Sequence, residues 1–202
     1  GGKWDWGELA VVLDSPLAAD ITKGYGRLKR FWDQEAKAVL AAGRHPLDFE
    51  QVLTVDDHQD HLRMVDYLSR NYRPTIVIAA GGMCAGGRII NYLKAMLGDP
   101  RHDVLFVGYQ AVGTPGYAIQ RYGPVGGYVE LDGERYDIRA GVHTLGGYSA
   151  HADQENLLDF IGAMSPPPRE LILVHGERQA KLALMAALRK RFAASGVQVR
   201  IG

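Results

Sequence analysis

Apolar runs that look like buried strands alternate along this chain with longer stretches of helical spacing, and this alternation constrains the fold more than any other feature. Strands separated by helices of about 10–15 residues are typical of a parallel sheet with helices on both faces. We therefore expect an α/β fold. The expected strands are residues 9–13, 49–55, 75–80, 104–107, 171–174 and 197–201, and the expected helices are residues 17–42, with an interruption at Gly24 and Gly26, 57–71, 89–97, 153–164 and 179–192.

The α/β rhythm is interrupted in the second half of the chain. Two short strand-like runs, residues 128–131 and 136–138, flank Asp132-Gly133, a pair that is typical of the tight turn in a β-hairpin. Beyond the hairpin the chain enters a loop rich in glycine and serine, centred on residues 141–147, before helical spacing returns. We therefore expect a first domain at residues 1–140 and a second segment at residues 141–202.

The composition excludes several classes of protein. The 202 residues carry 23 Lys and Arg against 23 Asp and Glu, so the chain lacks the basic character of many nucleic-acid-binding domains. Any nucleic acid must then be bound locally. The one cysteine, Cys84, cannot form an internal disulfide, and no apolar run reaches the roughly 20 residues that span a bilayer. We expect a cytoplasmic protein with no membrane partner.

A glycine-rich turn at residues 81–87 follows one expected strand and precedes a helix. At the carboxyl end of a parallel strand, glycines let backbone N–H groups point at an anion, and the N-terminus of the next helix adds positive potential. The turn matches neither a Walker A loop nor GxGxxG, so a tight turn that only brings the helix close to the strand is the alternative. Cys84, within the turn, is better explained as a small apolar side chain than as a nucleophile.

Two histidines occupy positions where chemistry can occur. His151 precedes the expected helix at residues 153–164, where it could act as a general acid or a metal ligand, or be an ordinary solvent-facing side chain. His175 directly follows the buried strand at residues 171–174, so a rigid element would hold its imidazole as a metal ligand requires. Packing at a strand end is the alternative for His175.

Residues 56–61, Asp-Asp-His-Gln-Asp-His, approach the metal-binding pattern HxHxDH but have Asp56 where that pattern begins with histidine. Metal sites of this kind normally follow a buried strand. Residues 56–61 instead run into an apolar stripe of helical spacing formed by Leu62, Val65 and Leu68. We therefore interpret them as the polar start of a helix.

Seven short motifs occur in an order that resembles one family. They are LDSPLA at 13–18, AGGM at 80–83, GGR at 86–88, FVGYQ at 106–110, GTPG at 113–116, GYSAHAD at 147–153 and LVHGE at 173–177. Together they are similar to the C-terminal part of the β-CASP ribonucleases of the metallo-β-lactamase fold, RNA-processing exonucleases and endonucleases such as the cleavage and polyadenylation specificity factor nuclease. The motifs span nearly the whole chain, and their order is far more specific than any one of them.

The resemblance implies a role for each part of the chain. Residues 1–140 would form the β-CASP cap domain, and residues 141–202 would return to the metallo-β-lactamase domain as its RNA-specificity segment. His151 falls on the motif B histidine beside the leaving oxygen, and His175 falls on the motif C histidine, a zinc ligand. The residues that the resemblance places against substrate phosphates are Gly82, Met83, Arg88, Ser149 and Ala150.

The activity implied by the resemblance is hydrolysis of RNA phosphodiester bonds, in which two zinc ions supply the attacking hydroxide and hold the developing charge. The implied partners are single-stranded RNA and an N-terminal metallo-β-lactamase region, while homodimer formation and the choice between exonuclease and endonuclease stay open. The family's HxHxDH motif does not occur in this sequence. We therefore expect this chain alone to be inactive and to hold no stable zinc centre.

Three residues depart from the family pattern. Gly81 and Gly146 stand where serine is common, and Tyr117 stands where arginine is common after Gly116. The loss of two hydroxyls and a cation weakens the expected binding of phosphate. The alternative is therefore that the chain belongs to a non-catalytic RNA-binding or scaffold member of the same family. An unrelated α/β phosphate-binding module, supported by the glycine loops alone, ranks last.

Overall fold

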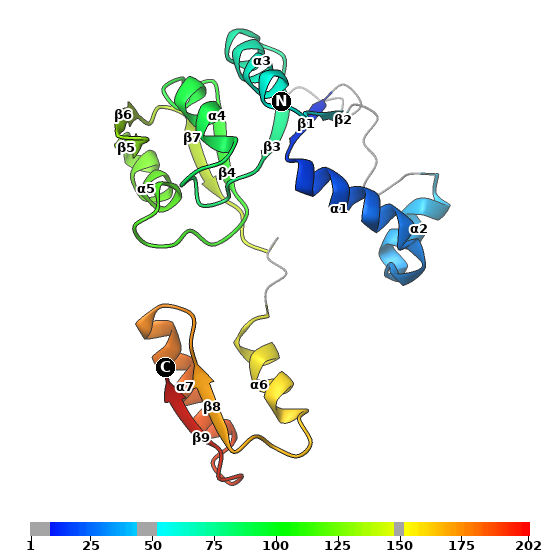
Figure 1. The fold of residues 1–202 in the computed structure, drawn as a ribbon, viewed down its shortest axis with the longest axis vertical. Helices are drawn as coiled ribbons and strands as arrows, with labels where there is room; N and C mark the ends of the chain where they lie inside the picture. Colours follow the sequence, from blue (N-terminus) through cyan, green and yellow to red (C-terminus); the bar gives the residue numbers. More distant parts are fainter. Residues whose placement is uncertain (1–8, 44–51, 148–151) are drawn as a thin grey trace. The chain divides into compact units, whose positions relative to one another are not determined.

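The computed structural model describes residues 9–43, 52–147 and 152–202, and the chain divides into two compact units after Tyr148 (Figure 1). Strands and helices alternate through most of both units, so the expected α/β class is confirmed. None of the described helices is long and apolar enough to cross a membrane.

The first unit contains most of the regular structure. Its helices are α1 (Pro16–Arg27), η1 (Lys29–Phe31), α2 (Gln34–Ala41), α3 (His58–Arg70), α4 (Ile89–Met96), α5 (Pro115–Tyr122) and η2 (Gly123–Val125). Its strands are β1 (Ala10–Asp14), β2 (Val52–Thr54), β3 (Thr75–Ala79), β4 (Asp103–Phe106), β5 (Tyr128–Leu131), β6 (Glu134–Asp137) and β7 (Gly141–Thr144). The second unit comprises α6 (Gln154–Gly162), β8 (Glu170–Leu173), α7 (Arg178–Arg191) and β9 (Gln198–Ile201).

Three parallel strands form a sheet in the order β2-β1-β3. The central strand β1 is apolar and buried, and Val12 at its middle packs against Val65 and Leu68 of α3. Because the three strands are parallel, their carboxyl ends meet at one edge of the sheet. That edge therefore brings together Asp14, the start of α3 and the glycine-rich turn that follows β3.

Helix α1 begins at the capping side chain of Ser15, with Pro16 in its first turn. The interruption expected at Gly24 and Gly26 is wrong, because α1 runs through both glycines to Arg27. A glycine in a helix interior costs only about 1 kcal/mol relative to alanine, which the rest of the helix can absorb. The helical stretch is instead broken between α1 and α2, where η1 intervenes.

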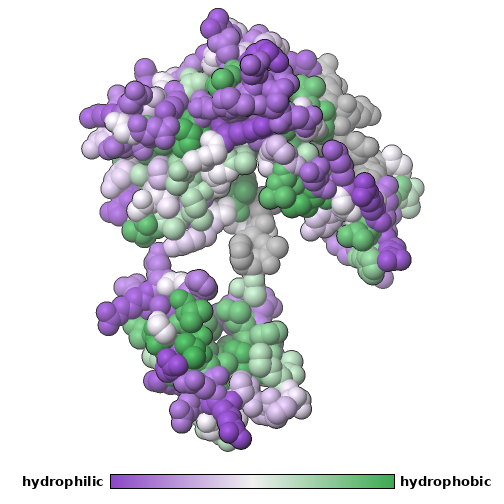
Figure 2. Space-filling view, in the orientation of Figure 1, coloured by the Kyte–Doolittle hydropathy of each residue, from purple (hydrophilic) through white to green (hydrophobic). Residues whose placement is uncertain are grey.

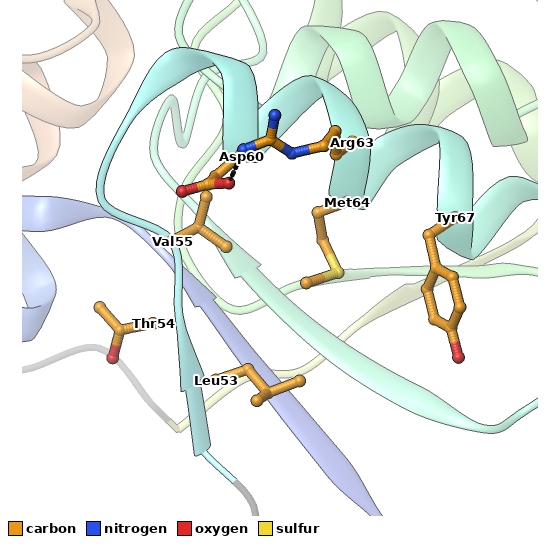
Figure 3. Close-up of a pocket in the computed structure, with 7 residues that line it drawn as sticks. All are labelled: Leu53, Thr54, Val55, Asp60, Arg63, Met64 and Tyr67. Atoms are coloured by element: carbon orange, nitrogen blue, oxygen red, sulfur yellow. Dashed lines mark hydrogen bonds and ion pairs between the residues drawn. The ribbon is translucent and has the colours of Figure 1, made fainter.

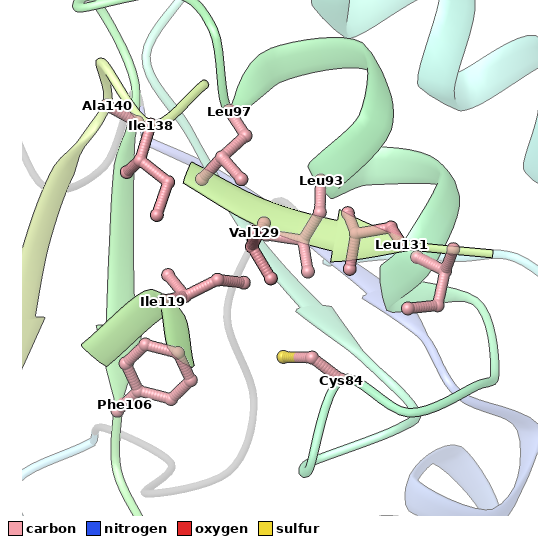
Figure 4. Close-up of a cluster of buried hydrophobic side chains, with 10 residues drawn as sticks. Cys84, Leu93, Leu97, Phe106, Ile119, Val129, Leu131, Ile138 and Ala140 are labelled. Carbon is pink, nitrogen blue, oxygen red and sulfur yellow. The ribbon is translucent and has the colours of Figure 1, made fainter. Parts of the chain in front are cut away.

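The main core of the first unit lies between α4, α5 and the β5–β6 hairpin (Figure 4). Leu93 of α4 and Leu97, which directly follows the helix, pack against Val129 and Leu131 of β5. Ile119 of α5 is completely buried. These apolar side chains hold α4, and with it the turn that precedes α4, against the hairpin.

The expected hairpin is confirmed, since β5 and β6 pair antiparallel on either side of Asp132-Gly133. Both turn residues have positive φ, 50° for Asp132 and 80° for Gly133, as a tight hairpin turn of this type requires. The prediction of a loop at residues 141–147 is wrong for its first four residues. They form β7, which pairs in parallel with β4.

The second unit is a two-stranded parallel sheet, β8 with β9, packed with its helices around Leu158, Leu188 and Val199. Asp153 caps α6. Its side chain accepts a hydrogen bond from the backbone N–H of Asn156, and the Asn156 side chain accepts one from the backbone N–H of Asp153. Ile172 and Val174 remain exposed. Figure 2 shows apolar side chains gathered on the drawn face of this unit.

Candidate functional site

The glycine-rich turn expected at residues 81–87 is confirmed and joins β3 to α4. Gly81 and Gly87 have positive φ values of 110° and 80°. A Cβ on Gly81 would lie 2.1 Å from the carbonyl oxygen of Gly86, and one on Gly87 would lie 2.9 Å from that of Ala80. The two ends of the turn therefore close on each other, and only glycine fits at either position.

Gly82 and Met83 form the exposed tip of this turn. The side-chain amide of Gln110 donates to the carbonyl oxygen of Gly82 at 3.0 Å, and the backbone N–H of Gly116 donates to that of Met83 at 3.0 Å. Gln110 belongs to the loop after β4, and Gly116 lies in the first turn of α5. The motifs that follow β3 and β4 thus meet, and the second one fixes the backbone of the first.

Cys84 lies in the same turn but faces the core. It is only 3% exposed and packs in the cluster of Figure 4. Burial raises the pKa of the Cys84 thiol to about 11, so the reactive thiolate is scarce at neutral pH. The structure agrees with its interpretation as an apolar side chain.

A buried polar cluster lies at the carboxyl ends of β1 to β3. Asp14, the last residue of β1, is completely buried, and its Oδ2 lies 2.6 Å from His61 Nδ1 and accepts a hydrogen bond from the Tyr92 hydroxyl at 2.6 Å. The guanidinium of Arg88 forms an ion pair with Oδ1 of the same carboxylate. On the far side of the imidazole, Asn91 Nδ2 lies 2.8 Å from His61 Nε2. The Asp14 carboxylate and the Asn91 amide thus contact the two ring nitrogens of His61 and fix the orientation of its imidazole.

The same guanidinium reaches two further acceptors. Its Nη1 donates to the carbonyl oxygen of Val55 at 2.7 Å and its Nη2 to that of Asp56 at 2.9 Å. Arg88 thereby joins the end of β1, the segment after β2 and the start of α4. The Arg88 side chain is 18% exposed, so the sequence-predicted phosphate ligand is largely turned into the protein.

These contacts control the charge of Asp14. Burial raises the pKa of a carboxyl group, but here the hydrogen bonds from Tyr92, His61 and Arg88 outweigh it and hold the pKa of Asp14 below its ordinary value of 3.8. Asp14 is therefore an anion at neutral pH, balanced by the charge of Arg88. Sequence reasoning did not identify Asp14, His61 or Tyr92 as members of a common cluster.

The expected polar helix start at residues 56–61 is confirmed. Asp57 precedes the first residue of α3, His58, and its side chain accepts a hydrogen bond from the backbone N–H of Asp60 at 2.7 Å, which lowers the pKa of Asp57. Leu62, expected in the apolar stripe, is 47% exposed, and His61 faces inward instead. In the described part of the chain, no group of three or more His, Cys, Asp or Glu side chains is arranged to hold a metal ion.

The two other sequence-predicted groups lie in or near the second unit. His175 follows β8 with an exposed side chain, and Gly176 beyond it has a φ of 100°. Because β8 ends at Leu173, His175 lies two residues beyond the strand rather than directly after it, with its imidazole accessible to a ligand. His151, Ser149 and Ala150 lie outside the described residues.

A separate open pocket of about 300 Å³ lies beside β2 and α3 (Figure 3). Its lining residues are Leu53, Thr54, Val55, Asp60, Arg63, Met64 and Tyr67. Asp60 and Arg63 form an ion pair with each other, and the rest of the lining is largely apolar. Asp60 belongs to the segment that approaches HxHxDH, but its carboxylate pairs with Arg63, so we assign the pocket no role in the candidate site.

Comparison with known proteins identifies the chain at the level of its family. Residues 2–119 match the family model of the Beta-Casp domain, and residues 135–201 match that of the Zn-dependent metallo-hydrolase RNA specificity domain. The ribonuclease TTHA0252 of Thermus thermophilus is 40% identical over 174 residues, which cover 86% of this chain and 38% of that protein.

Archaeal relatives match as well. The transcription termination factor FttA of Thermococcus kodakarensis is 38% identical over 124 residues, covering 60% of this chain and 19% of that protein. FttA of Methanosarcina mazei is 30% identical over 162 residues, covering 77% of this chain and 24% of that protein. The chain therefore spans less than two fifths of the length of these relatives. The resemblance seen in the motifs is confirmed, and the chain belongs to the β-CASP family of metallo-β-lactamase-fold nucleases.

Proposed function

We propose that this chain is the β-CASP and RNA-specificity part of a zinc-dependent ribonuclease that hydrolyses RNA phosphodiester bonds. The observation that carries the proposal is the order of the two family matches along one chain, 2–119 and then 135–201, together with 40% identity to a ribonuclease. The intact enzyme of this proposal joins residues 1–202 to a metallo-β-lactamase region. Single-stranded RNA is its proposed substrate.

We propose that the exposed tip of the turn at Gly82 and Met83 binds substrate phosphate, together with Ser149 and Ala150 of the GYSAHAD motif at residues 147–153. Gln110 and Gly116 donate hydrogen bonds to the carbonyl oxygens of Gly82 and Met83 and so hold the backbone of the tip in place. This supports the proposal, because a rigid backbone loses little conformational entropy when an anion binds to its N–H groups. Arg88 lies at the end of the same turn. Its charge adds to the positive potential there, although Asp14 offsets much of it.

We propose His175 as one ligand of a zinc ion. Its exposed imidazole, two residues beyond the end of β8, supports that role, and the family description of residues 135–201 names a zinc-dependent hydrolase. The other ligands must come from the metallo-β-lactamase region. When bound, zinc would supply Lewis-acid activation of water and of the phosphoryl group. His151 is the proposed proton donor to the leaving oxygen.

The remaining expectations stay predictions. We propose that the β-CASP domain comprises residues 1–140 and that the RNA-specificity segment comprises residues 141–202. The exposed apolar side chains of the second unit, among them Ile172 and Val174, support packing of that segment against the metallo-β-lactamase region. A cytoplasmic location and homodimer formation are likewise untested predictions.

A non-catalytic RNA-binding role is the second candidate. It is favoured by Gly81, where the conformation of the turn excludes the serine that is common in the family. The absence of a hydroxyl there would weaken phosphate binding without removing it. RNA cleavage separates the two candidates, because only the first requires it.

The experiment compares this chain with the intact enzyme in an assay of single-stranded RNA cleavage, alongside His151→Ala in the intact enzyme. The proposal predicts cleavage by the intact enzyme, none by residues 1–202 alone, and a loss of roughly 100-fold or more in kcat for His151→Ala, as expected for a general acid. RNA binding without cleavage by the intact enzyme would refute the nuclease proposal and support the second candidate.

A further inference from the structure

Apart from the charge of Arg88, the buried cluster around Asp14 is not used by the proposed chemistry, yet the burial of its polar groups is energetically costly. A carboxylate with no exposed surface, a largely buried guanidinium and a buried imidazole all lose their hydration. Ion pairs of this kind are often no more stabilising than apolar side chains of the same volume. Their advantage is geometric, because they accept only one arrangement of the elements that they join.

Arg88 is the member of the cluster that touches the candidate site. It directly follows Gly87 and precedes the first residue of α4, so its position sets where the glycine-rich turn ends. The backbone N–H of Ile89 donates to the carbonyl oxygen of Ala80 at 3.1 Å, which ties the end of the turn to its beginning. A shift of Arg88 would therefore move both ends of the turn.

The guanidinium is also oriented by three acceptors from two other elements. One is the carboxylate of Asp14 at the end of β1, and the others are the carbonyl oxygens of Val55 and Asp56 after β2. His61 from α3 and Tyr92 from α4 hold the Oδ2 atom of Asp14, so the carboxylate cannot rotate away. The Arg88 side chain therefore fixes the position of the turn relative to β1, β2, α3 and α4.

We infer that Asp14 and Arg88, supported by His61 and Tyr92, are positioning residues that hold the turn at residues 81–87 in its phosphate-binding conformation. The inference rests on the proposed function, in which that turn contacts substrate phosphate. It assigns Arg88 a role through Asp14 rather than direct contact with phosphate, and it explains why the Arg88 side chain is only 18% exposed.

Hydrogen exchange of residues 1–202 tests the inference without any catalytic assay. The variant Asp14→Asn/Arg88→Gln replaces the ion pair by two neutral amides, so no buried charge is left unpaired. We expect the backbone amides of Cys84 and Ile89, which donate to the carbonyl oxygens of Gly81 and Ala80 within the turn, to exchange at least about tenfold faster than in the wild type, while those of β5 and α5 keep their protection. The matched control is Asp99→Asn/Arg101→Gln, which removes a more exposed Arg–Asp pair of the same unit.

A double-mutant cycle in the intact enzyme tests the role in substrate binding. If Arg88 acts through Asp14, then Arg88→Gln raises KM about tenfold in the wild type and hardly at all in the Asp14→Asn background, with kcat changed less than about threefold. The slope of log KM against log salt concentration stays unchanged. A direct phosphate contact predicts the opposite, equal effects of Arg88→Gln in both backgrounds and a salt slope smaller by about one unit.

These experiments distinguish a failure of the inference about Asp14 and Arg88 from a failure of the proposed ribonuclease function. An intact wild-type enzyme that fails to cut RNA refutes the proposed function, while the hydrogen-exchange result still decides whether the Asp14–Arg88 pair fixes the turn. Unchanged exchange of the Cys84 and Ile89 amides in the folded double variant would overturn the inference. Equal KM effects of Arg88→Gln in the two backgrounds would also overturn it, in favour of direct contact with RNA.

Discussion

Replacing Gly81 by serine restores the residue that is common in the family, yet we predict that it destabilises this protein. Gly81 has a φ of 110°, a conformation that side chains other than glycine adopt at a cost of about 1–3 kcal/mol. The new Cβ would also lie 2.1 Å from the backbone oxygen of Gly86 and 2.8 Å from Cγ2 of Ile89. Since a backbone oxygen cannot rotate away, forced overpacking adds about 1–3 kcal/mol. The expected loss in the free energy of unfolding is thus at least about 2 kcal/mol.

Urea unfolding of residues 1–202 measures this loss. All three tryptophans, Trp4, Trp6 and Trp32, precede residue 149, so tryptophan fluorescence reports on the first unit alone. With a slope of about 2 kcal/mol per molar urea, the midpoint should fall by about 1 M for Gly81→Ser.

The matched control for this substitution is one residue away. A Cβ on Gly82 would meet no atom within 4 Å, and its φ lies outside the positive range, so Gly82→Ser should shift the midpoint only slightly. Equal midpoints for the two variants would refute the argument that the closed conformation of the turn requires glycine at position 81.

Three further predictions concern burial and charge. Cys84 should react with iodoacetamide at pH 8 at least about 100-fold more slowly in the folded chain than in urea, because burial raises its pKa to about 11; rapid alkylation of the folded chain would contradict its burial. Leu97→Ala should lower the free energy of unfolding by about 2–5 kcal/mol, whereas Leu17→Ala should change it by less than about 0.5 kcal/mol, because Leu97 is 1% and Leu17 72% exposed; similar urea midpoints would refute this contrast. Asp14 has a lower pKa in the folded than in the unfolded chain, so its contribution to stability is complete above its ordinary pKa of 3.8 and is lost as the pH falls through its folded value. Unfolding measured between pH 6 and 3 should therefore depend less steeply on pH for Asp14→Asn than for the wild type, and parallel curves would contradict the lowered pKa.

The parts of the fold that local signals determine could be predicted from the sequence. The apolar strand at residues 75–79, the glycines after it and the helical spacing from Ile89 fixed the strand, turn and helix that carry the candidate site. Asp132-Gly133 likewise predicted the hairpin, because few residue pairs accept two positive φ values in succession.

The elements that sequence reasoning missed depend on distant partners or on short signals. Strand β7 has only four residues, and its backbone hydrogen bonds go to β4, nearly forty residues earlier in the chain. Helix α5 has eight residues, but Thr114 as its cap and Pro115 in its first turn were readable signals of a helix start.

The candidate site shows the same limit. The position of Arg88 at the end of the turn could be predicted, but its contact with Asp14, 74 residues earlier, could not. A signal for the burial of His61 was present, since it precedes Val65 and Leu68 by four and seven residues on one helix face. A histidine on the apolar face of a helix needs a polar partner in the core, and only the structure identifies that partner as Asp14.

The most direct test of the account is the zinc content and RNA cleavage of the intact enzyme with His175→Ala. The account predicts that this variant binds less zinc than the wild type and cuts RNA at least about 100-fold more slowly, as expected when a metal ligand is lost. His143→Ala serves as the control, because His143 is another exposed histidine that pairs with Asp103 and not with the candidate site. Full zinc content and wild-type cleavage by the His175→Ala enzyme would contradict the account.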